Sequence, residues 1–381
     1  MRPQGRSIGR VGIIAAVVAL VLPLLAVGAH ATSTWYINSN TTLTEDHYGS
    51  IVIDADNVTL DCAGWRVVGT NGSDGIVIDG HSGVAVRNCI IQQFVYGIVV
   101  SNASAGLLEH NEVRWNGLSG IDVCCGSVDV IVRQNTMHEN GLDTGYSGID
   151  VEYGSSDVVV SGNTSWGNAG NGFYTYQSSN LVFDNNDAFS NSRGFDLDLE
   201  VTDSTLSNNR AVNNAGDGVN VVLSDDNRFI ANEVIGNGGR GFQVHRSSGN
   251  VLRSNDVRGN GADGISLDTE SSYNVIRDND VEWNNSTGIS ITFGSDWNLL
   301  AGNVTSHNGD GFRIGTSHNT LLDNDANDNT NYGFWVFGSY NKLALNSGCG
   351  NGILDALQEA GTKGNVWLAN NFCTSDILRQ R

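Results

Sequence analysis

Acidic and apolar residues alternate in the segment Gly194–Glu200, which has the sequence GFDLDLE. Such alternation is typical of a β-strand with one buried face, so Asp196, Asp198 and Glu200 share the opposite face. Side chains two positions apart on a strand start roughly 6.6 Å from each other. Inverting glycosidases hold an acid and a base about 6.5–9.5 Å apart, with a water molecule between them. The spacing therefore predicts acid–base chemistry, with Asp196 and Asp198 as the pair.

A repeating unit supplies the scaffold for these acids. From Gly75 onward the sequence repeats a glycine, an apolar residue, any residue, a second apolar residue, a variable stretch and an asparagine, often with a second asparagine five residues later. The unit glycines recur every 22 to 24 residues, except for the 28 residues from Gly120 to Gly148. A period this constant indicates a solenoid. The units lack both a helical period and the leucine spacing of leucine-rich repeats, which favours an all-β, right-handed parallel β-helix of about 12 coils.

The chain divides into four regions on this interpretation. Residues 1–31 are a signal peptide, 32–74 an N-terminal cap with the first coils, 75–348 the β-helix repeats, and 349–381 a C-terminal cap. Three arginines, a long apolar run and the tripeptide Ala-His-Ala give the first region the pattern of an export signal. We expect a secreted protein, extracellular or periplasmic; the alternative is that this apolar run stays uncleaved as a membrane anchor. The segment GILDALQEAG (352–361) is expected to form a short helix in the C-terminal cap.

Six cysteines in an exported chain predict disulfide bonds. Cys62 and Cys89 are 27 residues apart, and Cys349 and Cys373 are 24 apart. We expect a bond between Cys349 and Cys373 to clasp the last coil, although spacing alone leaves the full connectivity open. The adjacent Cys124 and Cys125 form either a vicinal disulfide or two free thiols.

The charge balance excludes two classes of partner. The sequence has 41 acidic and 20 basic residues, a formal net charge of −21. Such a chain is repelled by nucleic acid and by anionic membrane surfaces. No segment after the export signal is apolar for long enough to cross a bilayer. We expect a monomer that does not contact membranes once the signal is removed.

Two columns of outward-facing residues define the candidate site. Equivalent positions of successive coils stack roughly 4.8 Å apart, so the residues two and four positions after each unit glycine form two columns on one outer sheet. The middle coils gather acids, tyrosines and a histidine there. The candidate catalytic residues are Asp196, Asp198, Asp150, Glu152 and His245. The candidate substrate-binding residues are Asp122, Tyr174, Tyr176, Gln243, Arg246 and Asp268. The extra residues GLDTGYS (141–147) are expected to wall a cleft beside Asp150.

These units resemble the β-helix repeats of the pectate-lyase-like superfamily. The segments TTLTEDHYGSIVIDADNVTLDCAGWRV and NVWLANNFC resemble the NosD-like, carbohydrate-binding branch of secreted β-helix proteins. The resemblance implies a polysaccharide partner. Mannuronan epimerases of this fold carry the strand sequence Tyr-Gly-Phe-Asp-Pro-His. GFDLDLE matches its Gly-apolar-Asp part but lacks the proline and histidine, and Arg193 replaces the tyrosine. Hydrolysis by a carboxylate pair is therefore favoured over lyase or C5-epimerase action.

The resulting hypothesis is a secreted β-helix protein that binds, and in its stronger form cleaves, extracellular polysaccharide. A carbohydrate-active enzyme is favoured, as a glycoside hydrolase before a polysaccharide lyase or epimerase. The alternative is a non-catalytic surface or accessory protein with a carbohydrate-binding, adhesive or NosD-like metal-maturation role. No cofactor is required. Calcium is an optional ligand, for which Asp150, Glu152, Asp196 and Asp198 offer carboxylates, and a merely solvated acidic face is the simplest alternative for these acids.

Overall fold

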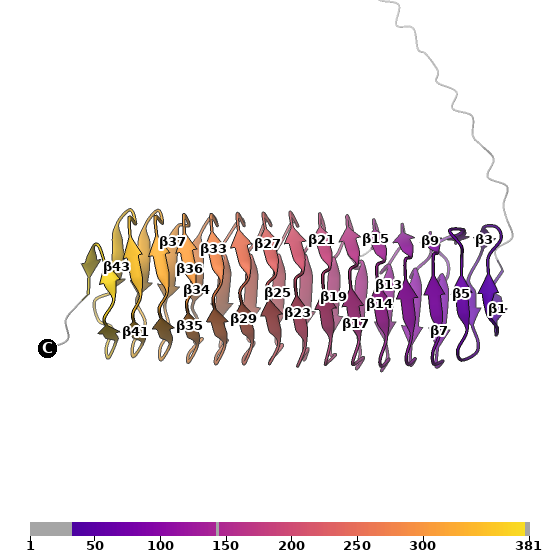
Figure 1. The fold of residues 1–381 in the computed structure, drawn as a ribbon, viewed down its shortest axis with the longest axis horizontal. Helices are drawn as coiled ribbons and strands as arrows, with labels where there is room; N and C mark the ends of the chain where they lie inside the picture. Colours follow the sequence, from indigo (N-terminus) through magenta and orange to yellow (C-terminus); the bar gives the residue numbers. More distant parts are fainter. Residues whose placement is uncertain (1–32, 142–144, 378–381) are drawn as a thin grey trace, which may run out of the picture. The chain divides into compact units, whose positions relative to one another are not determined.

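Three parallel β-sheets run along the whole described chain in a computed structural model, which describes residues 33–141 and 145–377. The chain passes through the three sheets in turn, and every strand except the first and last of each sheet pairs with its counterparts one coil before and after (Figure 1). The described residues contain no helix, and hence none that could span a bilayer. The predicted fold class, an all-β parallel β-helix, is confirmed.

Sheet A has 16 strands and carries the candidate site. Its strands are β1 (Trp35–Ile37), β4 (Ile51–Ile53), β7 (Ile76–Asp79), β10 (Ile98–Ser101), β13 (Ile121–Cys124), β16 (Ile149–Glu152), β19 (Phe173–Tyr176), β22 (Phe195–Asp198), β25 (Val219–Val222), β28 (Phe242–His245), β31 (Ile265–Asp268), β34 (Thr287–Ile291), β37 (Asp310–Ile314), β40 (Tyr332–Val336), β43 (Leu354–Gln358) and β46 (Ser375–Asp376).

Sheets B and C have 15 strands each. Sheet B consists of β2 (Thr41–Thr42), β5 (Thr59–Asp61), β8 (Ala85–Arg87), β11 (Leu107–Glu109), β14 (Ile131–Arg133), β17 (Val159–Ser161), β20 (Val182–Asp184), β23 (Thr205–Ser207), β26 (Arg228–Ile230), β29 (Val251–Arg253), β32 (Val275–Arg277), β35 (Leu299–Ala301), β38 (Thr320–Leu322), β41 (Lys342–Ala344) and β44 (Val366–Leu368). Sheet C consists of β3 (His47–Tyr48), β6 (Arg66–Val68), β9 (Ile90–Gln92), β12 (Glu112–Arg114), β15 (Thr136–His138), β18 (Thr164–Trp166), β21 (Asp187–Phe189), β24 (Arg210–Val212), β27 (Glu233–Ile235), β30 (Asp256–Arg258), β33 (Asp280–Glu282), β36 (Val304–Ser306), β39 (Asp325–Asn327), β42 (Ser347–Cys349) and β45 (Asn371–Phe372).

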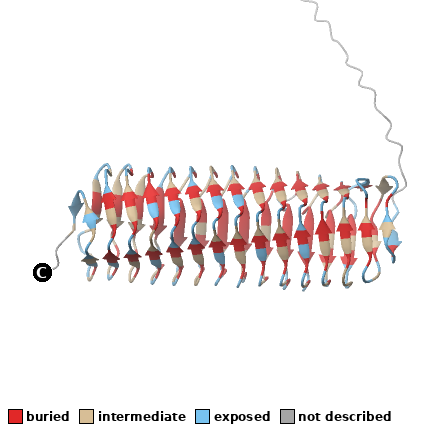
Figure 2. Ribbon diagram, viewed as in Figure 1, coloured by how far each residue is buried: buried red, intermediate tan, exposed pale blue. Residues whose placement is uncertain are grey.

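The core lies between the three sheets. The residues one and three positions after each unit glycine point inward, as Phe195 and Leu197 do, and they are buried in coil after coil. Figure 2 shows the burial concentrated on the strands and the exposure on the connecting turns. Like side chains stack along the axis, and the rings of Phe173 and Phe195 lie 4.7 Å apart. Stacking of this kind aligns each coil with the next, so the two outer columns keep their order.

Asparagine ladders lock the turns, as the sequence predicts. The side chain of Asn111 donates to Asn135 Oδ1 at 3.0 Å and to the carbonyl of Val86 at 3.0 Å, and the pattern continues through later coils. Asn88 lies one residue away from this ladder. Cys89 takes the ladder position instead: its backbone N–H donates a hydrogen bond to Asn111 Oδ1, and its sulfur is bonded to Cys62.

The ends of the solenoid differ from the prediction in one respect. The sheets extend beyond the twelve predicted coils at both ends, because residues 35–68 and 354–376 also form strands. The predicted helix at 352–361 is wrong: β43 occupies this segment and pairs with β40 and β46. Pairing satisfies the backbone of β40, which a helix would leave as an open sheet edge. The predicted bond between Cys349 and Cys373 is present. The predicted signal peptide, 1–31, lies outside the described residues.

Candidate functional site

The two columns on the outer face of sheet A form as predicted. Strand pairing places Asp122, Asp150, Tyr174 and Asp196 in one line, and Glu152, Tyr176 and Asp198 in the second. The second line continues through Val222 to His245 and Asp268. The first column is not solvated, however: Asp122, Asp150 and Asp196 are 6%, 3% and 4% exposed. Side chains that precede the strands of sheet A donate hydrogen bonds to Asp150 and Asp196.

Asp122 and Asp150 form the acidic centre of the site. They are paired residues on neighbouring strands, roughly 4.8 Å apart along the axis. Ser119 donates a hydrogen bond to Asp150 Oδ2, whereas the Oδ1 atoms of Asp122 and Asp150 are buried without a hydrogen-bond partner. A buried carboxylate oxygen without a donor is costly, and protonation removes the cost. Both groups are therefore placed to hold protons.

Burial raises the pKa of both carboxyls. Loss of hydration raises the pKa of Asp122 to about 8, with a further contribution from the charge of Asp150. Burial also raises the pKa of Asp150 to about 7, opposed by hydrogen bonds from Ser119 and Ser147 and reinforced by the charge of Glu152. Glu152, which is half-buried, has its pKa raised by burial. A carboxyl with a pKa near neutrality can donate and recover a proton during a reaction.

A pocket opens directly over Asp150. Its volume is about 350 Å³, and its lining residues are Gly145, Tyr146, Ser147, Asp150, Glu152, Asn171 and Tyr174. The wall formed by residues 145–147 belongs to the long interval between Gly120 and Gly148, as the sequence predicts. Residues 142–144 of the same insertion lie outside the described residues. The pocket thus combines a buried acid, a half-buried acid and an aromatic ring.

Three tyrosines border the acids. Tyr174 and Tyr176 are half-buried on β19, with ring centres 6.4 Å apart. The exposed Tyr153 packs edge-on against Tyr176 at 5.4 Å. The pKa of the Tyr174 hydroxyl is raised, first by burial and then by the charges of the acids around it. Tyr174 is a neutral hydrogen-bond donor over the working pH range, and its ring offers a surface for a sugar.

Asp196 and Asp198 lie outside this pocket. Asp196 is held by Asn220 at 2.7 Å, Asn171 at 3.0 Å and Arg193 at 3.0 Å. Burial still raises its pKa, against the opposing effect of Arg193. Asp198 is half-buried at the end of β22. The structure thus joins Asp150, Glu152 and Tyr174 in one pocket, and places the predicted pair two coils further along the same face.

His245 and its predicted neighbours form a separate group. His245 Nδ1 lies 2.5 Å from Asp268 Oδ1, across the gap between β28 and β31. Gln243 lies on the same strand in the first column. Arg246 follows the strand, is exposed, and takes part through its backbone N–H, which donates to the carbonyl of Thr269 at 3.2 Å. This His–Asp pair is four coils from Glu152 and does not share the pocket.

The two adjacent cysteines are free thiols. Their sulfur atoms lie side by side, with Cys124 buried and Cys125 exposed. Burial raises the pKa of Cys124. In residues 33–141 and 145–377, no group of three or more His, Cys, Asp or Glu side chains is arranged to hold a metal ion. Calcium at Asp150, Glu152, Asp196 and Asp198 stays a prediction.

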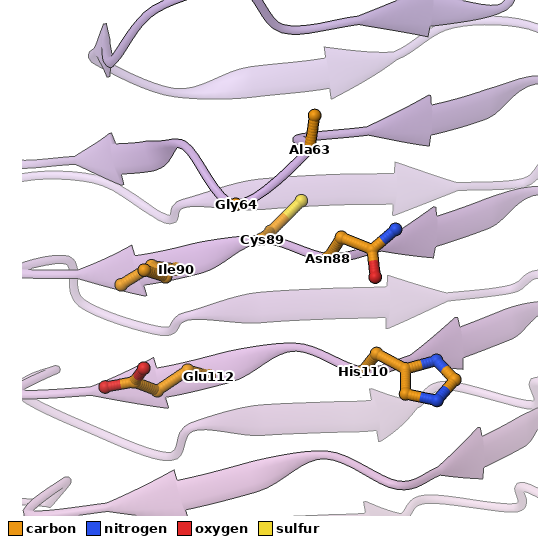
Figure 3. Close-up of a pocket in the computed structure, with 7 residues that line it drawn as sticks. All are labelled: Ala63, Gly64, Asn88, Cys89, Ile90, His110 and Glu112. Atoms are coloured by element: carbon orange, nitrogen blue, oxygen red, sulfur yellow. The ribbon is translucent and has the colours of Figure 1, made fainter.

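A second pocket lies near the N-terminal end, away from sheet A. Its volume is about 360 Å³, and it is lined by Ala63, Gly64, Asn88, Cys89, Ile90, His110 and Glu112 (Figure 3). Glu112 forms an ion pair with Arg114 and approaches His138 at 3.3 Å. Cys89 is joined to Cys62. None of the residues predicted from the sequence as functional lines this pocket.

Sequence reasoning missed three residues that hydrogen-bond to the acids: Ser119, Asn171 and Arg193. Each lies one position before a unit glycine. A third column, read at the position just before each unit glycine, would have shown polar residues beside the acidic coils. Their contact with the acids depends on how the turn folds over the sheet, which the repeat pattern does not specify.

Comparisons with known proteins agree with this architecture. A family model described as "Right handed beta helix region" matches residues 74–234 and 223–372. Among solved structures, the A-module of Azotobacter vinelandii mannuronan C-5 epimerase AlgE4 is similar at 17% identity, over 72% of this chain and 87% of that chain, with a TM-score of 0.55. The AlgE6 A-module from the same organism is 16% identical over 92% of both chains, with a TM-score of 0.52.

A third similar structure is the Dettilon tailspike protein gp208, which is 16% identical over 76% of this chain and 60% of that chain, with a TM-score of 0.54. No curated protein matches the sequence. At these identities the likeness concerns the fold alone. The chain belongs to the right-handed β-helix family.

Proposed function

We propose that the protein binds a polysaccharide along the outer face of sheet A and hydrolyses it in the Asp150 pocket. The observation that carries the proposal is a buried carboxyl, Asp150, with a pKa of about 7, lining an open pocket beside the half-buried Glu152. A proton donor and a proton acceptor on one strand are what glycosidic-bond hydrolysis requires. Two of the similar structures are mannuronan C-5 epimerases, which supports a glycan as the ligand class.

The different environments of Asp150 and Glu152 give the two carboxyls different roles. Asp150 donates its proton to the oxygen of the scissile bond, and Glu152 takes a proton from the attacking water. Their side chains start roughly 6.6 Å apart, because they are two positions apart on β16. This spacing lies within the range of about 6.5–9.5 Å for inversion. The charge of Glu152 also helps Asp150 to keep its proton until the bond breaks.

The surrounding residues bind and orient the sugar. The rings of Tyr174 and Tyr176 stack against sugar rings, and Asn171 and Ser147 offer hydrogen bonds at the pocket wall. Asp198, two coils away, binds sugar hydroxyls rather than carrying the bond cleavage. Asp196 is occupied by three hydrogen-bond donors and holds the shape of the groove.

The proposed setting is extracellular or periplasmic. Disulfides between Cys62 and Cys89 and between Cys349 and Cys373 support it, because such bonds persist in oxidising compartments. Fractionation of cells that express the full chain tests this point. Recovery of the protein in the cytoplasm with reduced cysteines would contradict it.

A screen of purified polysaccharides tests the function. New reducing ends report hydrolysis, ultraviolet absorbance of unsaturated sugars reports lyase action, and NMR of uronate polymers in D₂O reports C5 epimerisation. We expect new reducing ends without unsaturation, and a loss of roughly 10²–10⁴-fold in the Asp150→Asn variant. Asp198→Asn, the matched control on the next strand but one, is expected to change KM more than kcat. Unsaturated products would identify a lyase instead of a hydrolase, and C5 exchange would identify an epimerase. Binding without turnover would identify a carbohydrate-binding protein.

A further inference from the structure

An arginine held between aromatic rings lies on the same face of sheet A, towards its C-terminal end. The guanidinium carbon of Arg313 is 5.1 Å from the ring centre of Trp335 and 5.6 Å from that of Phe337. The two rings are 5.2 Å apart. We refer to Arg313, Trp335 and Phe337 as the arginine cluster. Cation–π contacts of this kind fix the plane of a guanidinium while leaving its outer N–H groups available.

Neighbouring residues hold the cluster in shape. The indole N–H of Trp335 donates to Glu359 Oε1 at 3.0 Å. Gly315 lies below Phe337, and a Cβ at this position would approach the Phe337 ring to 2.5 Å. The absence of a side chain at Gly315 therefore allows the ring to lie beside Arg313. All three residues of the cluster are half-buried, so the arrangement is a formed surface.

Arg313 has no ion-pair partner among the described residues, although the protein carries a net charge of −21. Its Nε is buried and without a hydrogen-bond partner. Burial raises the pKa of Asp310, and hydrogen bonds from Tyr332 and Asn331 together with the charge of Arg313 only partly offset that rise. The outer N–H groups of the guanidinium are not among the buried, unpartnered atoms, and an oxyanion with two coplanar oxygens could accept hydrogen bonds from them.

Arg313 belongs to the same column as Asp150. Strand pairing leads from Asp150 to Arg313 in seven steps. At roughly 4.8 Å a step, the two lie about 34 Å apart along the axis. The last four positions before Arg313 are uncharged; Gln243 is half-buried, and Asn220, Ser266 and Ser290 are buried. The column thus passes from buried acids, through amides and hydroxyls, to one cation.

We propose that the arginine cluster is a second glycan-binding subsite, which takes an anionic group of a sugar, a carboxylate or a sulfate ester. The glycan runs along the column, with its distal part at Arg313 and its reacting part in the Asp150 pocket. This inference deepens the proposed function and rests on it for the placement of the reacting part. Raised pKa values at Asp122 and Asp150 reduce the negative charge that an anionic chain meets at the other end.

Calorimetric binding tests the subsite without any turnover. The probes are a mannuronate decasaccharide, a sulfated maltodecaose and plain maltodecaose. We expect the wild-type protein to bind at least one anionic probe more tightly than maltodecaose, and Arg313→Gln to weaken that probe roughly tenfold. Arg277→Gln is the matched control, since Arg277 is exposed on sheet B and its loss removes the same charge. An equal loss in both variants, or in neither, overturns the proposal.

A second variant keeps the test valid if Arg313→Gln does not fold. Gly315→Ala displaces Phe337 and changes no charge, so we expect it to weaken the anionic probe by a smaller factor and to leave maltodecaose unchanged. Weakening of the mannuronate probe alone identifies a carboxylate, and weakening of the sulfated probe alone identifies a sulfate. No preference for either anionic probe over maltodecaose overturns the subsite.

The Asp150→Asn variant separates this inference from the proposed function. It is expected to retain the binding of the anionic probe and to lose turnover. If turnover is never found but Arg313→Gln still weakens binding, the subsite stands and hydrolysis fails. If Asp150→Asn abolishes turnover while Arg313→Gln binds as the wild type does, hydrolysis stands and the subsite fails.

Discussion

The pocket at Asp150 and the pocket at Glu112 have nearly the same volume, about 350 and 360 Å³. Their acids differ in environment. Asp150 is 3% exposed and has one oxygen without a partner, whereas Glu112 is half-buried and paired with Arg114. Glu112 makes an ion pair on the surface, whereas burial raises the pKa of Asp150 to about 7, so this carboxyl can exchange a proton near neutral pH. The two pockets therefore have nearly the same size but differ in the burial and pairing of their acids.

Matched substitutions in the two pockets give the largest expected contrast. We expect Glu152→Gln to lower kcat on the best polysaccharide roughly 10²–10⁴-fold, because the attacking water loses its base. Glu112→Gln is expected to leave kcat unchanged. Steady-state kinetics on both purified variants provide the measurement. Equal activity of the two variants would remove the distinction between the pockets.

The pH dependence of stability gives the next contrast. The folded-state pKa values of Asp122 and Asp150, about 8 and about 7, lie above the unfolded value of 3.8. Between these values the folded state binds more protons than the unfolded state, so stability falls as pH rises from about 4 to about 8. Thermal unfolding across this range measures it. The Asp122→Asn, Asp150→Asn double variant should flatten the profile, whereas Glu112→Gln should leave its slope intact.

The disulfide beneath the second pocket is expected to matter for stability only. Cys62 and Cys89 close a loop with a sequence separation of 27. Replacing both by serine should lower the free energy of unfolding by about 3 kcal/mol. Denaturant unfolding gives the stability, and kcat at a temperature where the variant is folded gives the function. A large fall in kcat of the folded variant would show that the second pocket acts in the reaction.

Calcium gives the smallest expected effect. The acids of sheet A lie along a column rather than around a point, and no group of three or more potential ligands surrounds a common centre within the described residues. We expect added calcium to leave Tm unchanged in the wild type and in Asp150→Asn. A saturable rise in Tm that Asp150→Asn abolishes would place a calcium ion in the Asp150 pocket.

Sequence reasoning predicted the fold and the columns because both follow from the repeat. A fixed interval between glycines sets the coil, and strict parallel pairing then places Asp122 beside Asp150 and Tyr174 beside Asp196. Burial of the first column was not predictable in this way. It arises from Ser119, Asn171 and other turn side chains that fold over the sheet, and their direction depends on turn geometry. For this reason the sequence favoured Asp196 and Asp198, and the pocket lies at Asp150 and Glu152.

The asparagine ladders and parallel pairing have a consequence for how this molecule can change. Each coil satisfies its backbone through identical bonds to the coil on either side, as Asn209 does between Asn186 and Asn232. The first-column residues from Asn220 to Ser290 are uncharged. A whole coil could be duplicated or lost in this part of the solenoid, with every bond between coils formed again at the junction. The spacing between the Asp150 pocket and Arg313 would then change in increments of roughly 4.8 Å. Gene duplication could thus lengthen the glycan-binding surface by whole coils while leaving the chemistry at either end intact.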